Sequence, residues 1–173
     1  DFDRLEALVT RAIELDPGFA TAYTLRSRAL LSRLWVLSDL TDEQWTMIGS
    51  DIDSARRIAG DTEAVLAAQT SLEYYGHMDY GRALDTTRAA LSRYPNDLLL
   101  REFEGLLLRR LGQWENAIAV FRELVGREPS NPSYVGTLVE LLHSMRRYAE
   151  VISTVEAFER RAPPDSYVAE VGA

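Results

Sequence analysis

The chain has 173 residues and a formal net charge of −8 at pH 7, and 46% of its residues are hydrophobic and 27% charged. This composition is that of a globular protein, and it excludes a wholly disordered chain. There is no cysteine, and all 19 basic residues are arginine, which excludes disulfides, thiolate metal sites and a catalytic or phosphate-binding lysine. An acidic chain is a poor match for a phosphate backbone, and no apolar run reaches the roughly 20 residues of a membrane span. We therefore expect no nucleic-acid binding by this segment and no membrane insertion.

The N-terminal segment, residues 3–17, has apolar residues at helical spacing and ends at Pro17. No partner helix precedes it, so the sequence predicts a half repeat here. The chain begins at Asp1 rather than Met and shows no signal peptide. We expect a truncated or processed N-terminus and a cytoplasmic location.

The next segment, residues 20–60, contains two long helical patterns. It runs about nine residues beyond the repeat length found later in the chain, and the extra length is expected to extend both helices. The second helix begins with a capping-box pattern, in which Thr41 and Gln44 can satisfy each other's free backbone donors. The sequence therefore predicts an extended hairpin with a projecting tip around Ser38–Asp42.

Two tryptophans, Trp35 and Trp45, flank this tip. Paired apolar helix faces usually form core, so the two side chains are expected to pack together and hold the hairpin. The alternative is that they form an exposed aromatic anchor for a partner protein.

Three further repeats follow, at residues 64–95, 98–129 and 132–163. They end at Pro95, Pro129 and Pro163, which are 34 residues apart. A period of this length indicates stacked units, because one unit cannot bury its own apolar face. Residues 164–173 are expected to be a tail or the start of a capping helix, and residues 1–173 to form a single domain.

Each repeat is predicted to be a helical hairpin. In the repeat at 98–129, Ala117, Ile118, Phe121 and Leu124 have helical spacing, and a short turn at Gly112 precedes them. No segment sustains the alternation of a strand.

These repeats resemble the tetratricopeptide repeat (TPR) family, whose signature is a 34-residue helix–turn–helix with small residues at the helix contact. The resemblance implies an all-α fold, a right-handed superhelix of antiparallel helix pairs. The residues that carry it in the third full unit are Gly105, Leu108, Gly112, Ala117, Phe121 and Pro129.

The resemblance also implies a concave groove lined by the first helix of each pair, and a non-enzymatic scaffold that binds a peptide or partner protein there. Leu72 and Leu106 have an alternative role, packing against neighbouring repeats. The residues expected to line the groove are Arg28, Leu72, Tyr75, Leu99, Glu102, Leu106, Arg109 and His143.

Two other functions stay open. Segments 74–84 and 109–117 resemble the TPR arrays of bacterial signalling proteins, so the chain is alternatively a regulatory or oligomerising segment of a larger signalling enzyme or transcription regulator. The apolar centre of the groove would also suit a small-molecule sensor.

No catalytic, metal or cofactor site is expected. His77 and His143 lie in different units without spaced ligand partners. The Asp51-Ile-Asp53 sequence lacks the glycine and distal glutamate of a calcium loop, and alternate residues of a helix point apart. The arginine pairs, of which Arg160-Arg161 is one, are expected to form a solvated face rather than an anion-binding stripe. We therefore predict that the chain is not an enzyme.

Overall fold

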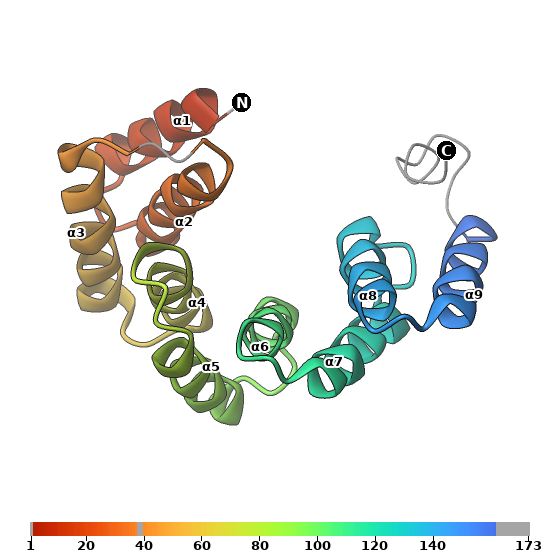
Figure 1. Cartoon of the computed structure of the whole chain (residues 1–173). Coiled ribbons are helices and arrows are strands. Elements are labelled where there is room, and N and C mark those ends of the chain that lie inside the picture. The colour runs from red at the N-terminus through yellow and green to blue at the C-terminus, as the bar shows by residue number, and fades with distance from the viewer. Residues whose placement is uncertain (1, 38–39, 162–173) are drawn as a thin grey trace. The chain divides into compact units, whose positions relative to one another are not determined.

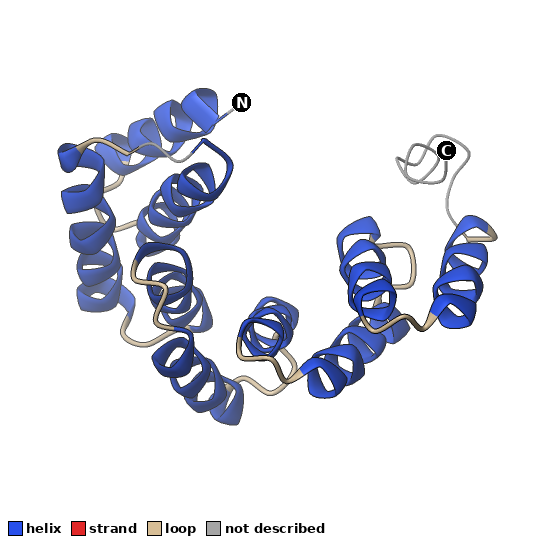
Figure 2. Ribbon diagram, in the orientation of Figure 1, coloured by secondary structure: helices blue, strands red, loops and turns tan. Residues whose placement is uncertain are grey.

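A computed structural model describes residues 2–37 and 40–161, without the side chains of residue 2 and residues 35–37. Every regular element in this part of the chain is helical (Figures 1 and 2). The elements are α1 (Phe2–Leu15), α2 (Ala20–Leu37), α3 (Asp42–Ala59), α4 (Glu63–Ser71), the π-helical turn η1 (Leu72–Gly76), α5 (Tyr80–Arg93), α6 (Leu98–Arg110), α7 (Trp114–Arg127), α8 (Pro132–Ser144) and α9 (Tyr148–Glu159).

The helices group into two compact units. Unit 1 is Asp1–Leu100 and unit 2 is Arg101–Ala173, so the boundary falls in the first turn of α6. The single-domain organisation and the repeat boundaries stay predictions.

The helices α2 and α3 have 18 residues each, whereas α5 and α7 have 14 each. This is the lengthening that the sequence predicts for the extra residues. The capping box at the start of α3 is confirmed: Gln44 N–H donates to Thr41 Oγ1 over 3.2 Å, and Thr41 N–H donates to Gln44 Oε1 over 3.1 Å. Residues 38–39 of the predicted tip lie outside the described residues.

Unit 1 has two apolar clusters. One joins α2, α3 and α4 through five buried residues, against which partly buried side chains pack. The other joins α4, α5 and the start of α6. The residues of the first cluster are Leu30, Leu31, Ile48, Ile52 and Ala68, and those of the second are Ala67, Ala90, Leu91 and Leu100.

In unit 2, α6 and α7 approach closely at Gly105. A Cβ atom placed on Gly105 would lie 2.6 Å from Cε2 of Phe121, and both Phe121 and Ala117 are fully buried. The predicted role of small residues at the helix contact is therefore confirmed at this position.

The turns inside three helix pairs share one backbone conformation. Met78, Gly112 and Arg146 have φ angles of 53°, 75° and 58°, and they are 34 residues apart. Only Gly112 adopts this left-handed conformation without a steric cost. The predicted turn at Gly112 is confirmed, and the 34-residue period is present in the backbone itself.

Candidate functional site

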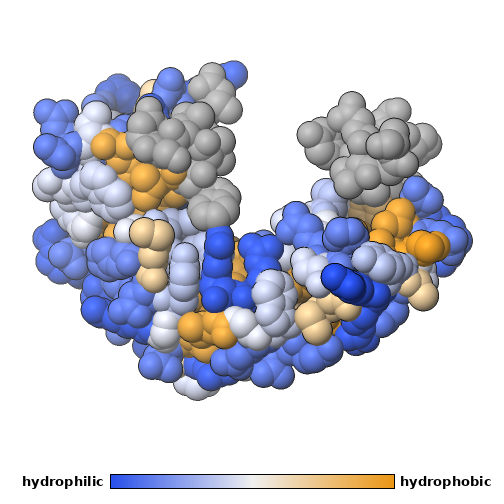
Figure 3. Space-filling model, viewed as in Figure 1, coloured by the Kyte–Doolittle hydropathy of each residue, from blue (hydrophilic) through white to orange (hydrophobic). Residues whose placement is uncertain are grey.

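The predicted groove residues lie on the first helix of each helix pair and divide between the two units. We call each group the first-helix face of its unit. The first-helix face of unit 1 comprises Arg28, Leu72, Tyr75 and Leu99, and that of unit 2 comprises Glu102, Leu106, Arg109 and His143. On the side of the molecule seen in Figure 3, hydrophobic residues lie as separate patches between hydrophilic ones.

In unit 1, Leu72 and Tyr75 are half-buried and pack against the cluster of α2, α3 and α4. The Tyr75 ring also meets the ring of Tyr74 edge-on, with centroids 4.6 Å apart. Leu99 packs in the same half-buried way on the second cluster. These side chains therefore contribute to the core and keep part of their surface exposed, so the packing alternative holds for Leu72.

In unit 2, an ion pair links two first helices. Arg109 Nη1 donates to Glu140 Oε2 over 3.2 Å, which joins α6 to α8. Leu106 precedes Arg109 by three residues on the same face of α6 and is half-buried. His143 is exposed, and its ring lies edge-on to Tyr148 with centroids 5.7 Å apart. This face offers an apolar side chain beside a charged pair.

The π-helical turn η1 carries a buried carboxylate that the sequence interpretation missed. Glu73 is 1% exposed, and its Oε1 accepts hydrogen bonds from Gln69 Nε2 and Arg82 Nε, each over 3.1 Å. Among the residues that the structure describes, its Oε2 has no hydrogen-bond partner. A buried carboxylate oxygen is costly to leave unpaired, so Glu73 lowers the stability of this turn relative to an apolar side chain.

Of the two tryptophans that flank the predicted tip, the structure describes the side chain of Trp45. Trp45 is half-buried and packs on the cluster that contains Leu31 and Ile48. A Cβ atom on Gly76 would lie 3.2 Å from Cζ3 of Trp45, so η1 lies against the indole. The Trp35 side chain lies outside the described residues. Both roles of this pair stay predictions.

The two aspartates of the Asp51-Ile-Asp53 sequence lie in different environments. Asp51 is buried, and both of its carboxylate oxygens accept from Arg26, over 2.8 Å from Nε and 2.7 Å from Nη2. The hydrogen bonds to Asp51 are the main reason that the pKa of Arg26 is raised. Asp53 is exposed on the same helix. Asp51 therefore holds α3 to α2 through a bidentate ion pair.

A charge cluster on the surface of unit 2 joins α7 to α9. Glu150 accepts from Arg147 and Arg122, and Arg147 also reaches Glu115 over 2.9 Å. The hydrogen bond from Arg147 is the largest cause of the lowered pKa of Glu150, and the same bond raises the pKa of Arg147. These pairs are structural contacts between helices.

Over residues 2–37 and 40–161, no group of three or more His, Cys, Asp or Glu side chains could hold a metal ion. Within the same residues, each helix is too short or too polar to cross a bilayer.

Comparison with known proteins identifies the fold. No protein-family model and no curated protein sequence matches the chain. Among solved structures, TTC0263, a TPR protein of Thermus thermophilus, is 20% identical with a TM-score of 0.75, and the match covers 95% of this chain and 84% of that one. PilF of Pseudomonas aeruginosa is 16% identical with a TM-score of 0.65, over 95% of this chain and 70% of that one.

A third structure, YrrB, is described as a TPR protein with an unusual peptide-binding site. It is 16% identical with a TM-score of 0.56, over 91% of this chain and 76% of that one. Identities this low show the fold alone. The predicted resemblance and fold class are confirmed, and the chain has an all-α, TPR-type helical-repeat fold.

Proposed function

We propose that the chain is a non-enzymatic protein-interaction scaffold that binds a peptide or partner protein through its first-helix faces. The observation that carries the proposal is the half-buried Leu106 next to the Arg109–Glu140 ion pair on one face of unit 2. Such a face suits a peptide with an apolar anchor, and a carboxylate of the peptide could compete with Glu140 for the arginine fork.

Two further observations support the proposal. Tyr75 and Leu72 leave part of their surface exposed on the first-helix face of unit 1. A structure with the same fold, YrrB, is described as peptide-binding. The cytoplasmic location and the bacterial signalling context stay predictions.

Selection from a random peptide library displayed on phage tests the proposal. Synthetic versions of the selected peptides are titrated against the chain by fluorescence anisotropy. We expect Tyr75→Ala and Arg109→Ala to weaken binding by tenfold or more, because interface aromatic and arginine residues carry much of the binding energy.

Matched controls lie on second helices. Asp85 of α5 and Asn116 of α7 are exposed, and Asp85→Ala and Asn116→Ala should leave the affinity unchanged. Circular dichroism checks that each variant keeps its helix content, since Tyr75 also packs on the core. Unchanged affinity in both first-helix variants would refute the proposal.

A further inference from the structure

Unit 2 contains a cavity of about 210 Å³ that is bounded by α7, α8 and α9. It lies on a different side of α8 from the first-helix face, because Val135 and Leu138 are rotated by roughly 80–160° around the helix from Glu140 and His143. The cavity has an apolar lining. The side chains that form it include Val125, Val135, Leu138, Ala157 and Phe158.

The repeat period shows that this apolar lining differs from the equivalent positions of the preceding helix pair. The residues 34 positions before Val135 and Leu138 are Arg101 and Glu104. Those two side chains form an ion pair over 2.7 Å, and Arg101 also lies 3.6 Å from Glu123. The α8 repeat therefore has apolar residues where the α6 repeat has a charged network.

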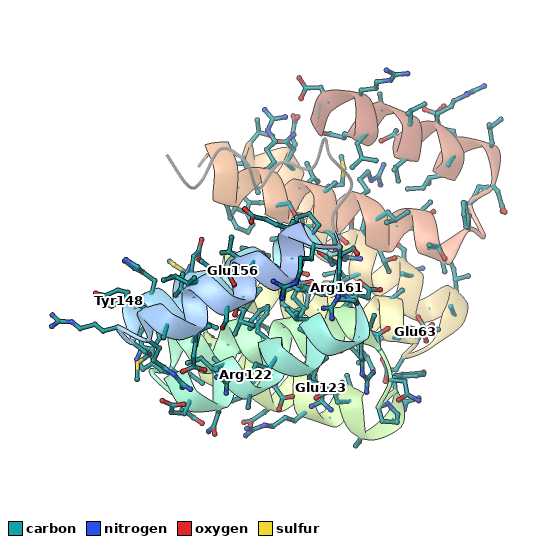
Figure 4. All side chains as sticks on the ribbon, turned by 90° about the vertical axis from the view of Figure 1, so that its right-hand side faces the viewer. Glu63, Arg122, Glu123, Tyr148, Glu156 and Arg161 are labelled. Carbon is teal, nitrogen blue, oxygen red and sulfur yellow. The ribbon has the colours of Figure 1, made fainter. Side chains whose placement is uncertain are left out.

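Two arginines line the cavity, Arg122 on α7 and Arg161 after α9. Figure 4 labels both residues. Arg122 is paired with Glu150. Arg161 is exposed, and the ion pair with Glu156 near the end of α9 is formed by its neighbour Arg160. An anion held at the edge of the cavity would complement this charge.

The volume sets the size of the group that fits. A cavity of about 150 Å³ is large enough to hold benzene, so 210 Å³ accommodates one side chain of the size of leucine or phenylalanine. The exposed arginines and Ser153 at its edge leave the cavity open to solvent, so that the rest of a bound chain can leave it.

We propose that this cavity binds the C-terminal residue of a partner peptide, with an apolar side chain against Val135, Leu138 and Phe158 and the terminal carboxylate against Arg161. This second site does not rest on the first-helix faces, and Arg109→Ala should leave it unchanged.

The test titrates the whole chain with a fluorescein-labelled hexapeptide that ends in leucine with a free carboxylate. Two control peptides end in leucine amide and in glycine. We expect the amide and the glycine peptide to bind at least tenfold more weakly, because the amide lacks the charge-assisted bond and the glycine leaves the cavity unfilled.

Protein variants separate the two halves of the site. Arg161→Ala removes the cation and Ala157→Leu fills the cavity. Each substitution should weaken the affinity for the leucine peptide by at least tenfold. Arg160→Ala is the matched control, because Arg160 is exposed and does not line the cavity, and it should bind as the unaltered chain does.

Three results would overturn the proposal. The amide peptide could bind as tightly as the acid. N-acetyl-leucine could bind as tightly as the hexapeptide, which would make a free small acid the ligand. The third result is that none of the peptides binds at millimolar concentration, as would happen if residues 162–173 filled the cavity. The titrations that compare peptides use the unaltered chain, so they test the proposal even if a protein variant fails to fold.

Discussion

The helix contact at Gly105 gives a sharp prediction about stability. In Gly105→Ala, the new Cβ would lie 2.6 Å from Cε2 and 3.0 Å from Cδ2 of Phe121, and 3.1 Å from Cγ1 of Val120. The Phe121 ring is fully buried and cannot turn away. Overpacking of this kind costs about 1–3 kcal/mol, whereas alanine gains roughly 1 kcal/mol over glycine in a helix interior. The net loss should therefore be about 0–2 kcal/mol.

Gly136→Ala is the matched control, since Gly136 lies inside α8 and a Cβ there would have no atom of the described residues within 4 Å. This variant should be more stable than the unaltered chain by up to about 1 kcal/mol. The difference between the two variants isolates the clash, about 1–3 kcal/mol. Urea unfolding followed by circular dichroism measures it. The reasoning fails if Gly105→Ala is as stable as Gly136→Ala.

Three carboxylates give further predictions about the stability of the fold. Asp51→Ala removes the bidentate carboxylate from the part-buried Arg26 guanidinium and leaves it the hydrogen bond to Thr10, so urea unfolding should show a loss of up to about 3–5 kcal/mol. Because Arg147 lowers the pKa of Glu150, this carboxylate stabilises unit 2 above its ordinary pKa of about 4.3. That stability is lost as pH falls through the lower folded pKa, so the melting-temperature gap to Glu150→Gln should be present at neutral pH and close once the pH lies below the folded pKa. Glu73→Leu should be neutral or stabilising in thermal unfolding, because it removes a buried, half-paired carboxylate.

The sequence predicts local structure well because the signals are local. The capping box at Thr41 and the stop after each helix pair at Pro95 and Pro129 depend on neighbouring residues and on proline's missing N–H. The capping box and the helix stops need no knowledge of distant residues. The close contact at Gly105 follows from the family resemblance, which implies a small residue at the helix contact.

Contacts between distant residues are harder to predict. The Arg26–Asp51 pair joins residues 25 apart through two hydrogen bonds, and nothing local distinguishes Asp51 from the exposed Asp53. For the same reason the sequence places Tyr75 on a groove, whereas the structure shows it shared between the core cluster and the surface. Helical periodicity identifies a face but not the neighbour that covers it.

The repeat period nevertheless contains a signal for the features that the predicted groove leaves out. Glu73 precedes Leu107 by 34 residues and Leu141 by twice that, and all three positions are buried. A carboxylate at a position that takes leucine elsewhere is a departure that alignment of the repeats exposes. Arg101 departs in the same direction, since it is charged where Ala67 and Val135 are apolar. In a repeat protein the shared pattern specifies the fold, because every unit must stack on its neighbour. Residues that break the pattern are free of that requirement, so they are where chemistry particular to one unit should be sought.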